Sequence, residues 1–160
     1  MSVLYDLQNE TVLDCYLKNS VKSKEDSKKQ IKTYSERELA LMHLEHCNKD
    51  DIVIMDRGYP SYKLFKQYSK KTNFLIRCKS NSFKEIKYLF NLDCKDNDIV
   101  VELKAPNSLL KENDNISKTI KIRFVRVILN NGAIEVLATN IFPTSTQKWV
   151  KRVVLWGFKF

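Results

Sequence analysis

The feature that most constrains this sequence is a short apolar run that ends on a carboxylate, within the segment DIVIMDRGYPSYKLF at residues 51–65. Residues 52–55 are four consecutive apolar side chains between acids, a pattern typical of a short buried strand. Asp56 follows the run directly, and Gly58 and Pro60 then interrupt regular structure. The pattern therefore predicts a strand that ends at an acid and is followed by a break.

A helix is expected after this break, with Pro60 in its first turn. Its predicted apolar face is made by Leu64, Phe65 and Tyr68. In open α/β sheets, ligands and metals are held at the carboxyl ends of the strands. Asp56 is therefore a candidate metal ligand, and Arg57 beside it is a candidate phosphate contact. The alternative is that Asp56 only caps the turn.

The composition is that of a basic globular protein. At 160 residues, the chain is long enough for one domain with a substantial hydrophobic core. The 28 Lys and Arg outnumber the 19 Asp and Glu, which gives a formal net charge of +9. Such a charge favours a polyanionic partner, most often a nucleic acid. The alternative is a coding bias toward lysine and asparagine that carries no function.

Cysteine usage and hydropathy indicate the compartment. The four cysteines include no Cys-x-x-Cys pair, so we expect reduced, mostly buried thiols rather than a zinc module or disulfides. No apolar run approaches the roughly 18 residues that cross a bilayer. We therefore expect a soluble, cytoplasmic protein with no membrane partner.

The residues before the central segment predict a hairpin, a loop and a helix. Two β-rich runs, at residues 2–6 and 11–17, are joined by a turn at 8–10. Residues 18–34 are polar and lysine-rich, which predicts an exposed loop that is either solvated or in contact with DNA backbone. The capping box Ser-Glu-Arg-Glu then starts a helix over residues 35–47.

His43 and His46 lie three residues apart on this helix. They could share a metal ion, but no third ligand occurs at a useful spacing. We therefore interpret them as packing or surface histidines.

The residues after the central segment predict another strand and helix. Residues 73–78 read as an apolar strand, and Ser82 to Glu85 form a second capping box. The helix that this box starts has an apolar face made by Phe83, Ile86, Leu89 and Phe90. Strands that alternate with helices at this pitch predict parallel crossover units in an α/β fold.

From residue 96 onward the pattern is rich in strands. The predicted strands lie at residues 99–103, 119–129 and 133–138, with a hairpin turn at 130–132 and a loop at 106–117. Within 119–129, apolar residues alternate with the basic Lys121 and Arg123, which predicts one buried and one cationic face. The cationic face either lies along phosphates or is a solvated edge of the sheet.

The run Asp-Arg-Gly-Tyr-Pro-Ser after an apolar strand resembles the second-aspartate motif of the insertion-sequence DDE transposases, in the large family numbered four. The resemblance continues in the right order over roughly residues 1–142. Its other pieces are Leu4-Tyr5-Asp6, Ser35-Glu36-Arg37, His43-Leu44, Phe74-Leu75-Ile76-Arg77 and Leu137-Ala138-Thr139-Asn140.

This resemblance implies a ribonuclease-H-like core with a mixed sheet and flanking helices. Three carboxylates (Asp, Asp, Glu) there hold two Mg²⁺ or Mn²⁺ ions, which support cleavage and joining of DNA strands. Asp56 matches the second aspartate and is implied to be a catalytic residue and metal ligand. The implied partners are DNA, at the element ends and at the target, and a second transposase copy. The implied location is the bacterial cytoplasm, at the nucleoid.

Residues expected to contact DNA lie near this motif and on the basic strand. They are Arg57, Tyr59, Lys63, Arg77, Lys79, Lys121 and Arg123.

The resemblance also divides the chain. Residues 1–95 form a partial ribonuclease-H-like core, 96–142 an inserted β-strand meander, and 143–160 a divergent or frameshifted tail. The first aspartate of the family would precede Met1, and no acid follows Glu135 where the family's glutamate is expected. We therefore expect a transposase fragment that is inactive alone.

Two other hypotheses remain open. One is a non-catalytic basic remnant that binds DNA or a transposase. The other is an unrelated metal nuclease, whose site would need Asp6, Asp14 or Asp51 as further ligands.

Overall fold

The computed structural model describes residues 2–16, 34–112 and 118–142, with side chains described up to residue 110 in the second range. It divides the chain into two units, Met1–Asn48 and Lys49–Phe160. Most of the predicted loop at 18–34 and the whole tail at 143–160 lie outside the described residues.

The first unit combines a hairpin with a short helical segment. Strands β1 (Ser2–Asp6) and β2 (Thr11–Tyr16) pair antiparallel, as the two β-rich runs predict. Helix α1 (Glu36–Met42) continues into the 3-10 helix η1 (His43–His46). The predicted capping box is confirmed, because the Ser35 hydroxyl accepts from the Glu38 N–H and the Glu38 carboxylate accepts from the Ser35 N–H.

A buried histidine joins the hairpin to the helix in this unit. The His43 ring bonds through Nδ1 to the Asp14 carboxylate at 2.8 Å and through Nε2 to the Ser2 hydroxyl at 3.0 Å. A carboxylate can only accept, so Nδ1 carries a proton and donates to Asp14. His46 Nε2 lies 3.5 Å from the same Asp14 oxygen. His43 is therefore a packing residue that is fully hydrogen-bonded.

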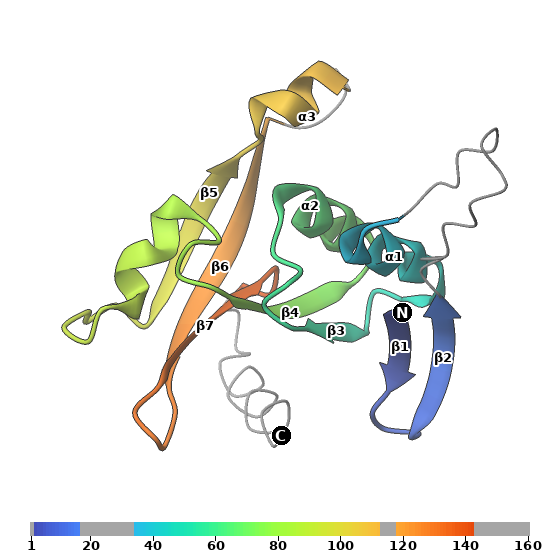
Figure 1. Ribbon diagram of the computed structural model, residues 1–160, viewed down its shortest axis with the longest axis horizontal. Helices are drawn as coiled ribbons and strands as arrows, with labels where there is room; N and C mark the ends of the chain where they lie inside the picture. Colours follow the sequence, from blue (N-terminus) through green and yellow to red (C-terminus); the bar gives the residue numbers. More distant parts are fainter. Residues whose placement is uncertain (1, 17–33, 113–117, 143–160) are drawn as a thin grey trace, which may run out of the picture. The chain divides into compact units, whose positions relative to one another are not determined.

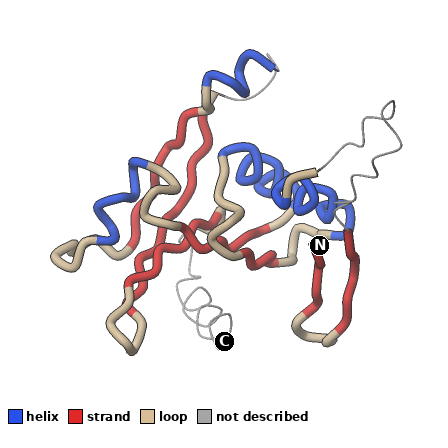
Figure 2. The backbone as a smooth tube through the Cα atoms, in the orientation of Figure 1, coloured by secondary structure: helices blue, strands red, loops and turns tan. Residues whose placement is uncertain are grey.

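The second unit is built on one five-stranded sheet with the order β3-β4-β7-β6-β5. Figure 1 labels these strands, and Figure 2 draws them in red. Strand β3 pairs parallel with β4, and the other neighbours pair antiparallel. The strands are β3 (Ile52–Met55), β4 (Asn73–Cys78), β5 (Asp98–Lys104), β6 (Thr119–Ile128) and β7 (Ile134–Thr139). The strands of the expected meander thus extend the sheet that β3 and β4 begin.

Helix α2 (Tyr62–Lys71) forms the crossover between the parallel strands β3 and β4. Its N-cap is Ser61, whose hydroxyl accepts from the Leu64 N–H at 3.3 Å. Pro60 therefore precedes the cap, and its predicted place in the first helical turn is wrong. The predicted apolar face is confirmed, since Leu64, Phe65 and Tyr68 are all buried.

The predicted second capping box is wrong. The Ser82 hydroxyl accepts from the Lys79 N–H at 2.8 Å, so it closes the preceding turn instead of capping a helix. The segment after it is the 3-10 helix η2 (Lys84–Phe90). Its buried residues, Ile86 and Leu89, are three apart, which matches the three-residue repeat of a 3-10 helix.

The predicted loop at 106–117 contains a short helix, α3 (Asn107–Glu112). It begins at the Pro106 carbonyl, which accepts from the N–H groups of Leu109 and Leu110. A proline directly before a helix suits this start, because its fixed φ is already helical. The hairpin turn after β6 is as predicted, with Gly132 at a φ of +80°.

The core of this unit lies on both faces of the sheet. On one face, Phe65 stacks on Phe74 with ring centroids 5.3 Å apart, and Phe83 contacts both Phe65 and Phe124. On the other face, Leu75 and Leu137 are buried side by side, with Val125 and Val127 against them. The predicted fold class is confirmed: it is a mixed α/β fold with flanking helices, consistent with a ribonuclease-H-like arrangement.

Asn140 continues the β4–β7 ladder beyond the end of β7. Its Oδ1 accepts from the Phe74 N–H and its Nδ2 donates to the Thr72 carbonyl, both at 3.0 Å. Thr139 donates from its hydroxyl to the Phe74 carbonyl at 2.7 Å. Side chains here take the place of backbone partners, so they fix where β7 ends against β4.

All four cysteines are free thiols, as predicted. Cys47 and Cys78 are buried, whereas Cys94 is half-buried and Cys15 is exposed. Burial raises the pKa of the Cys78 thiol to about 12. The expectation of mostly buried thiols therefore holds for two of the four residues.

We predict that Asn140→Ala destabilises the second unit by about 1–2 kcal/mol, because it leaves the Phe74 N–H and the Thr72 carbonyl without their partners. Urea denaturation gives the change in stability, and amide hydrogen exchange at Phe74 should be faster in the variant. Asn130→Ala, in the exposed hairpin turn, is the matched control and should change stability by about 0.3 kcal/mol or less. Equal effects of the two substitutions would contradict the role assigned to Asn140.

We predict that the stabilising effect of Asp14 disappears in acid. Partial burial acts to raise the pKa of Asp14, but the hydrogen bonds from His43 and Cys15 and the nearby histidine charges lower it overall from the ordinary 3.8. A carboxyl group with a lowered folded pKa stabilises the fold above its unfolded pKa and loses this effect as pH falls through the folded pKa. Asp14→Asn should therefore destabilise the first unit at pH 7 and have little effect at about pH 2.

This prediction can be checked by urea denaturation followed through the NMR signals of β1, β2 and α1. A difference between the wild type and Asp14→Asn that stays constant from pH 7 to the acid limit would disprove it.

Candidate active site at the end of strand β3

Asp56 lies one residue beyond the last pair of β3, at the carboxyl end of the strand. The β3–β4 register pairs Met55 with Ile76, so Asp56 comes level with Arg77 on the neighbouring strand. The chain turns at once, with the Tyr59 N–H donating to the Asp56 carbonyl at 3.2 Å. The Asp56 side chain is 66% exposed. The sequence-predicted carboxylate therefore stands in solvent at the end of the sheet.

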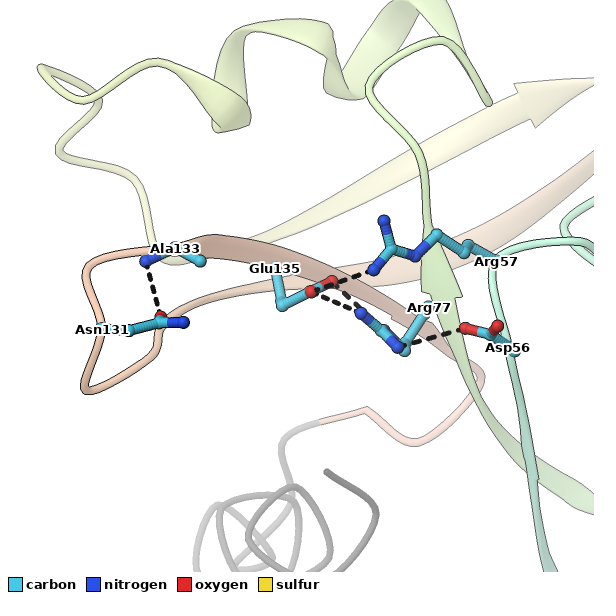
Figure 3. Close-up of polar contacts among 6 residues, drawn as sticks. All are labelled: Asp56, Arg57, Arg77, Asn131, Ala133 and Glu135. Atoms are coloured by element: carbon cyan, nitrogen blue, oxygen red, sulfur yellow. Dashed lines mark hydrogen bonds and ion pairs between the residues drawn. The ribbon is translucent and has the colours of Figure 1, made fainter. Parts of the chain in front are cut away.

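Arg77 connects this carboxylate to a second one. Its Nη1 donates to Asp56 Oδ1 at 3.2 Å. Its Nε and Nη2 donate to the two oxygens of Glu135, at 3.3 and 2.5 Å. Figure 3 shows Arg77 between the two acids. One guanidinium group thus contacts carboxylates from two other segments of the chain.

The sheet register explains why Glu135 faces Arg77. Arg77 is paired with Leu137 across the β4–β7 ladder, and Glu135 is two residues from Leu137 on the same strand. Side chains two residues apart point to the same face of a sheet, and diagonal neighbours are within reach of long side chains. The Glu135 and Arg77 side chains are 11% and 21% exposed.

Arg57 completes the group, with its Nη2 3.7 Å from Glu135 Oε1 and its side chain 49% exposed. We call Asp56, Arg57, Arg77 and Glu135 the strand-end cluster. It holds two carboxylates and two guanidinium groups, so its formal charges cancel. Its buried half is the Arg77–Glu135 contact, and its exposed half is Asp56 and Arg57.

Glu135 was missed by the sequence interpretation. The signal was present, because Glu135 is a lone acid within the predicted apolar strand at 133–138. A charged group on a buried strand needs an opposite charge, and Arg77 is likewise the lone charge on the apolar strand at 73–78. Pairing these two residues required knowing that the two strands are neighbours.

The other residues expected to contact DNA fall into two groups. Tyr59, Lys63 and Lys79 lie on the segments around the cluster: the turn after β3, helix α2 and the end of β4. Lys63 and Lys79 are exposed, and Tyr59 is half-buried. Lys121 is exposed on β6, where it pairs with Glu102 of β5.

The predicted cationic face of β6 is wrong at Arg123. This side chain is buried, with 2% of the residue exposed. Its Nε donates to Asp98 Oδ1 at 2.7 Å, its Nη2 donates to the other oxygen, and its Nη1 donates to the Ile141 carbonyl. Arg123 therefore fastens β5 and the end of β7 to β6. The period-two pattern failed because this face of β6 is also covered.

The candidate ligands of an unrelated nuclease have other contacts. Asp6 accepts hydrogen bonds from Gln8 and Asn9 in the hairpin turn, and these bonds lower its pKa. Asp14 accepts from His43. Asp51 accepts through its backbone carbonyl from Thr72 and Asn73.

The donor set at the strand-end cluster can be compared with the needs of a divalent cation. Mg²⁺ and Mn²⁺ favour carboxylate oxygens, and Asp56 exposes such a group. Glu135 lies between two guanidinium groups. Within the parts of the chain that the structure describes, no three His, Cys, Asp or Glu residues are grouped so that they could hold a metal ion. Asp56 therefore fits one ligand position, but the cluster is not a complete metal site.

Comparison with known protein families decides the relationship of this chain. A sequence model of the transposase DDE domain matches residues 1–151. The chain belongs to the transposase DDE domain family. No curated protein and no solved structure matches it.

Transposases of the DDE domain family act on DNA and generally use divalent metal ions. The match runs over both units of the fold and includes the whole strand-end cluster. None of the helices in the described ranges has the length and apolar character needed to span a membrane.

We predict that Glu135→Ala destabilises the protein by about 2 kcal/mol, because it leaves the half-buried Arg77 without two of its hydrogen bonds. Glu135→Gln keeps an acceptor and should cost about half as much. The matched control is Glu102→Ala, which removes an exposed acid that accepts from the Thr119 hydroxyl on the neighbouring strand. Urea denaturation of the full chain measures all three; a Glu135→Ala effect no larger than that of the control would show that the contact is not stabilising.

Proposed function

We propose that this chain is part of an insertion-sequence transposase of the large family numbered four, and that Asp56 is one of its metal-binding catalytic carboxylates. The observation that supports this most is the position of Asp56. It is an exposed acid at the carboxyl end of a parallel strand, in a chain that belongs to the transposase DDE domain family.

In such a site, bound Mg²⁺ or Mn²⁺ would activate the attacking oxygen and stabilise the leaving oxygen in DNA strand cleavage and transfer. The residues of this chain would hold the Asp56 carboxylate in position. Strand β3 and its pairing with β4 present the Asp56 carboxylate, and the Arg77 and Arg57 guanidinium groups set the charge around it.

The proposed DNA-contacting surface surrounds the strand-end cluster. Arg57, Lys63 and Lys79 are exposed cations on three consecutive segments of the α/β unit, and Tyr59 lies among them in sequence. Arg77 is half-buried and joins this surface through its exposed contact with Asp56. Lys121 is a further exposed candidate on β6, whereas the ion-paired and buried Arg123 is not.

We propose that the chain alone binds DNA but does not cut it. Two metal ions about 4 Å apart need several carboxylate ligands. In the strand-end cluster, Asp56 is in contact with one guanidinium group, and Glu135 is in contact with two. The cluster is therefore arranged as a charge-balanced ion-pair network, and this chain would act as a basic DNA-binding or transposase-interacting module.

We predict that the chain binds duplex DNA with an affinity that falls steeply as the salt concentration rises. Fluorescence anisotropy at NaCl concentrations from about 50 to about 300 mM can measure this dependence. Arg57→Gln and Lys79→Gln should each weaken binding and reduce the slope of log affinity against log salt by about 1, since each removes a phosphate contact. Lys104→Gln, on β5 at the opposite edge of the sheet, is the control and should leave the slope unchanged. Binding that is independent of salt would contradict the proposed function.

A further inference from the structure

The two edge strands of the five-stranded sheet differ in character. Strand β5, at one end of the order, has three exposed charged side chains, Asp98, Glu102 and Lys104. Charges of this kind keep the edge of a sheet from pairing with another chain. Strand β3, at the other end, has the sequence Ile-Val-Ile-Met, and its register with β4 is regular. The β3 edge therefore has no charge, proline or bulge that would block pairing.

The β3 edge also exposes apolar side chains. Ile52 and Ile54 are two residues apart and so point to the same face, and each is 38% exposed. Within the described ranges, β3 pairs with β4 alone. The outer edge of such a strand directs backbone N–H and C=O groups away from the sheet, and an extended segment of another chain can bond to them. The edge thus offers both backbone and apolar contacts to an added strand.

We propose that the β3 edge is a docking surface for a second copy of this chain, in which the two β3 strands pair antiparallel about a two-fold axis. The two five-stranded sheets would then form one continuous sheet. This inference goes beyond the proposed DNA binding and does not depend on it. The charges that flank the strand favour a second copy over another partner.

The residues that flank β3 carry opposite charges at its two ends. Asp51 precedes the strand and Arg57 follows it, and both are exposed. An antiparallel strand pair with two-fold symmetry is centred on one residue, which faces its own copy. With Ile54 at the centre, Asp51 faces Arg57 of the second copy, and the symmetry makes this contact twice. Opposite charges at facing positions stabilise a strand pair.

A pairing centred on the neighbouring residue, Val53, has the opposite effect. It would place Asp50 opposite Asp56 of the second copy, again twice. Like charges at facing positions destabilise a strand pair. The flanking charges therefore select the pairing centred on Ile54, in which the Ile54 side chain also lies against its own copy.

The proposed contact is small, because β3 has four residues. We therefore expect a weak dimer, with a dissociation constant on the order of 10–100 µM. The net charge of +9 makes two copies repel each other at long range, and salt at about 150 mM limits that repulsion to short distances.

The test is sedimentation equilibrium of the full chain without DNA, at protein concentrations from about 1 to about 300 µM in about 150 mM NaCl. Ile54→Lys places two cations face to face at the axis and should raise the dimer dissociation constant about tenfold. Val100→Lys is the matched control, because it puts the same charge on an exposed apolar residue of the other edge strand, and it should leave the dissociation constant unchanged. Circular dichroism shows that each variant is folded.

A charge exchange tests the pairing register. Asp51→Arg and Arg57→Asp, each alone, place like charges at facing positions and should raise the dissociation constant about threefold. The double variant restores opposite charges and should return to within about twofold of the wild type. Loss of folding cannot produce such a recovery, so this series decides the matter if Ile54→Lys does not fold.

Three results would overturn the inference: a chain that stays monomeric over the whole concentration range, a dimer that Ile54→Lys and Val100→Lys weaken equally, or a dimer that persists in folded Ile54→Lys. Amide hydrogen exchange gives a second readout. Exchange in β3 should slow as the protein concentration rises, whereas exchange in β5 should not change; equal behaviour of the two edge strands also counts against the inference. Because the samples contain no DNA, these results are separate from those that test the proposed DNA binding.

Discussion

The pairing of β4 with β7 is the interaction on which the second unit depends. It joins the parallel pair β3–β4 to the antiparallel strands β7, β6 and β5, and it also places Arg77 beside Glu135. A slip of one residue would send Glu135 to the opposite face, among the aromatic side chains of the core. Thr139 and Asn140 prevent such a slip, since their side chains bond to backbone groups at a single position near the start of β4. The charge cluster at one end of this ladder is therefore set by side-chain bonds at the other end.

Much of the fold was accessible from the sequence because the signals were local. Four apolar residues before an acid predicted the strand β3, but its predicted burial is wrong, because Ile52 and Ile54 are exposed on this edge strand. The Ser-Glu-Arg-Glu box predicted α1. The failures occurred where a residue had two plausible local partners. Ser82 could cap a helix or close a turn, and it closes a turn. Local propensity does not decide such cases, because the energies of the two arrangements are similar.

The candidate site was only half accessible from the sequence. Asp56 and Arg57 were named because they directly follow an apolar strand, and Arg77 was named from the resemblance to the DDE transposases. Glu135 lies 79 residues after Asp56 in the numbering, and only the order of the strands brings it near. The reverse error occurred at Arg123, where an alternating pattern predicted an exposed cation and the structure has a buried ion pair. Arg126 is similar, since it is buried and donates to the carbonyls of Leu89 and Asn91. The 28 Lys and Arg thus include arginines that hold strands and loops together inside the fold, so this number overstates the cations available to a polyanion.

The short strand β3 has a consequence for motion. It has four residues, it lies at one end of the five-stranded order, and Asp56 comes one residue after its last pair with β4. The terminal pair of such a strand opens more readily than pairs in the middle of a sheet, on time scales far shorter than global unfolding. The Arg77–Asp56 contact lies at this opening end and holds the end of β3 against β4. The Asp56 carboxylate would then be most firmly placed when the Arg77 guanidinium group is bound to it, and least so when that contact is open.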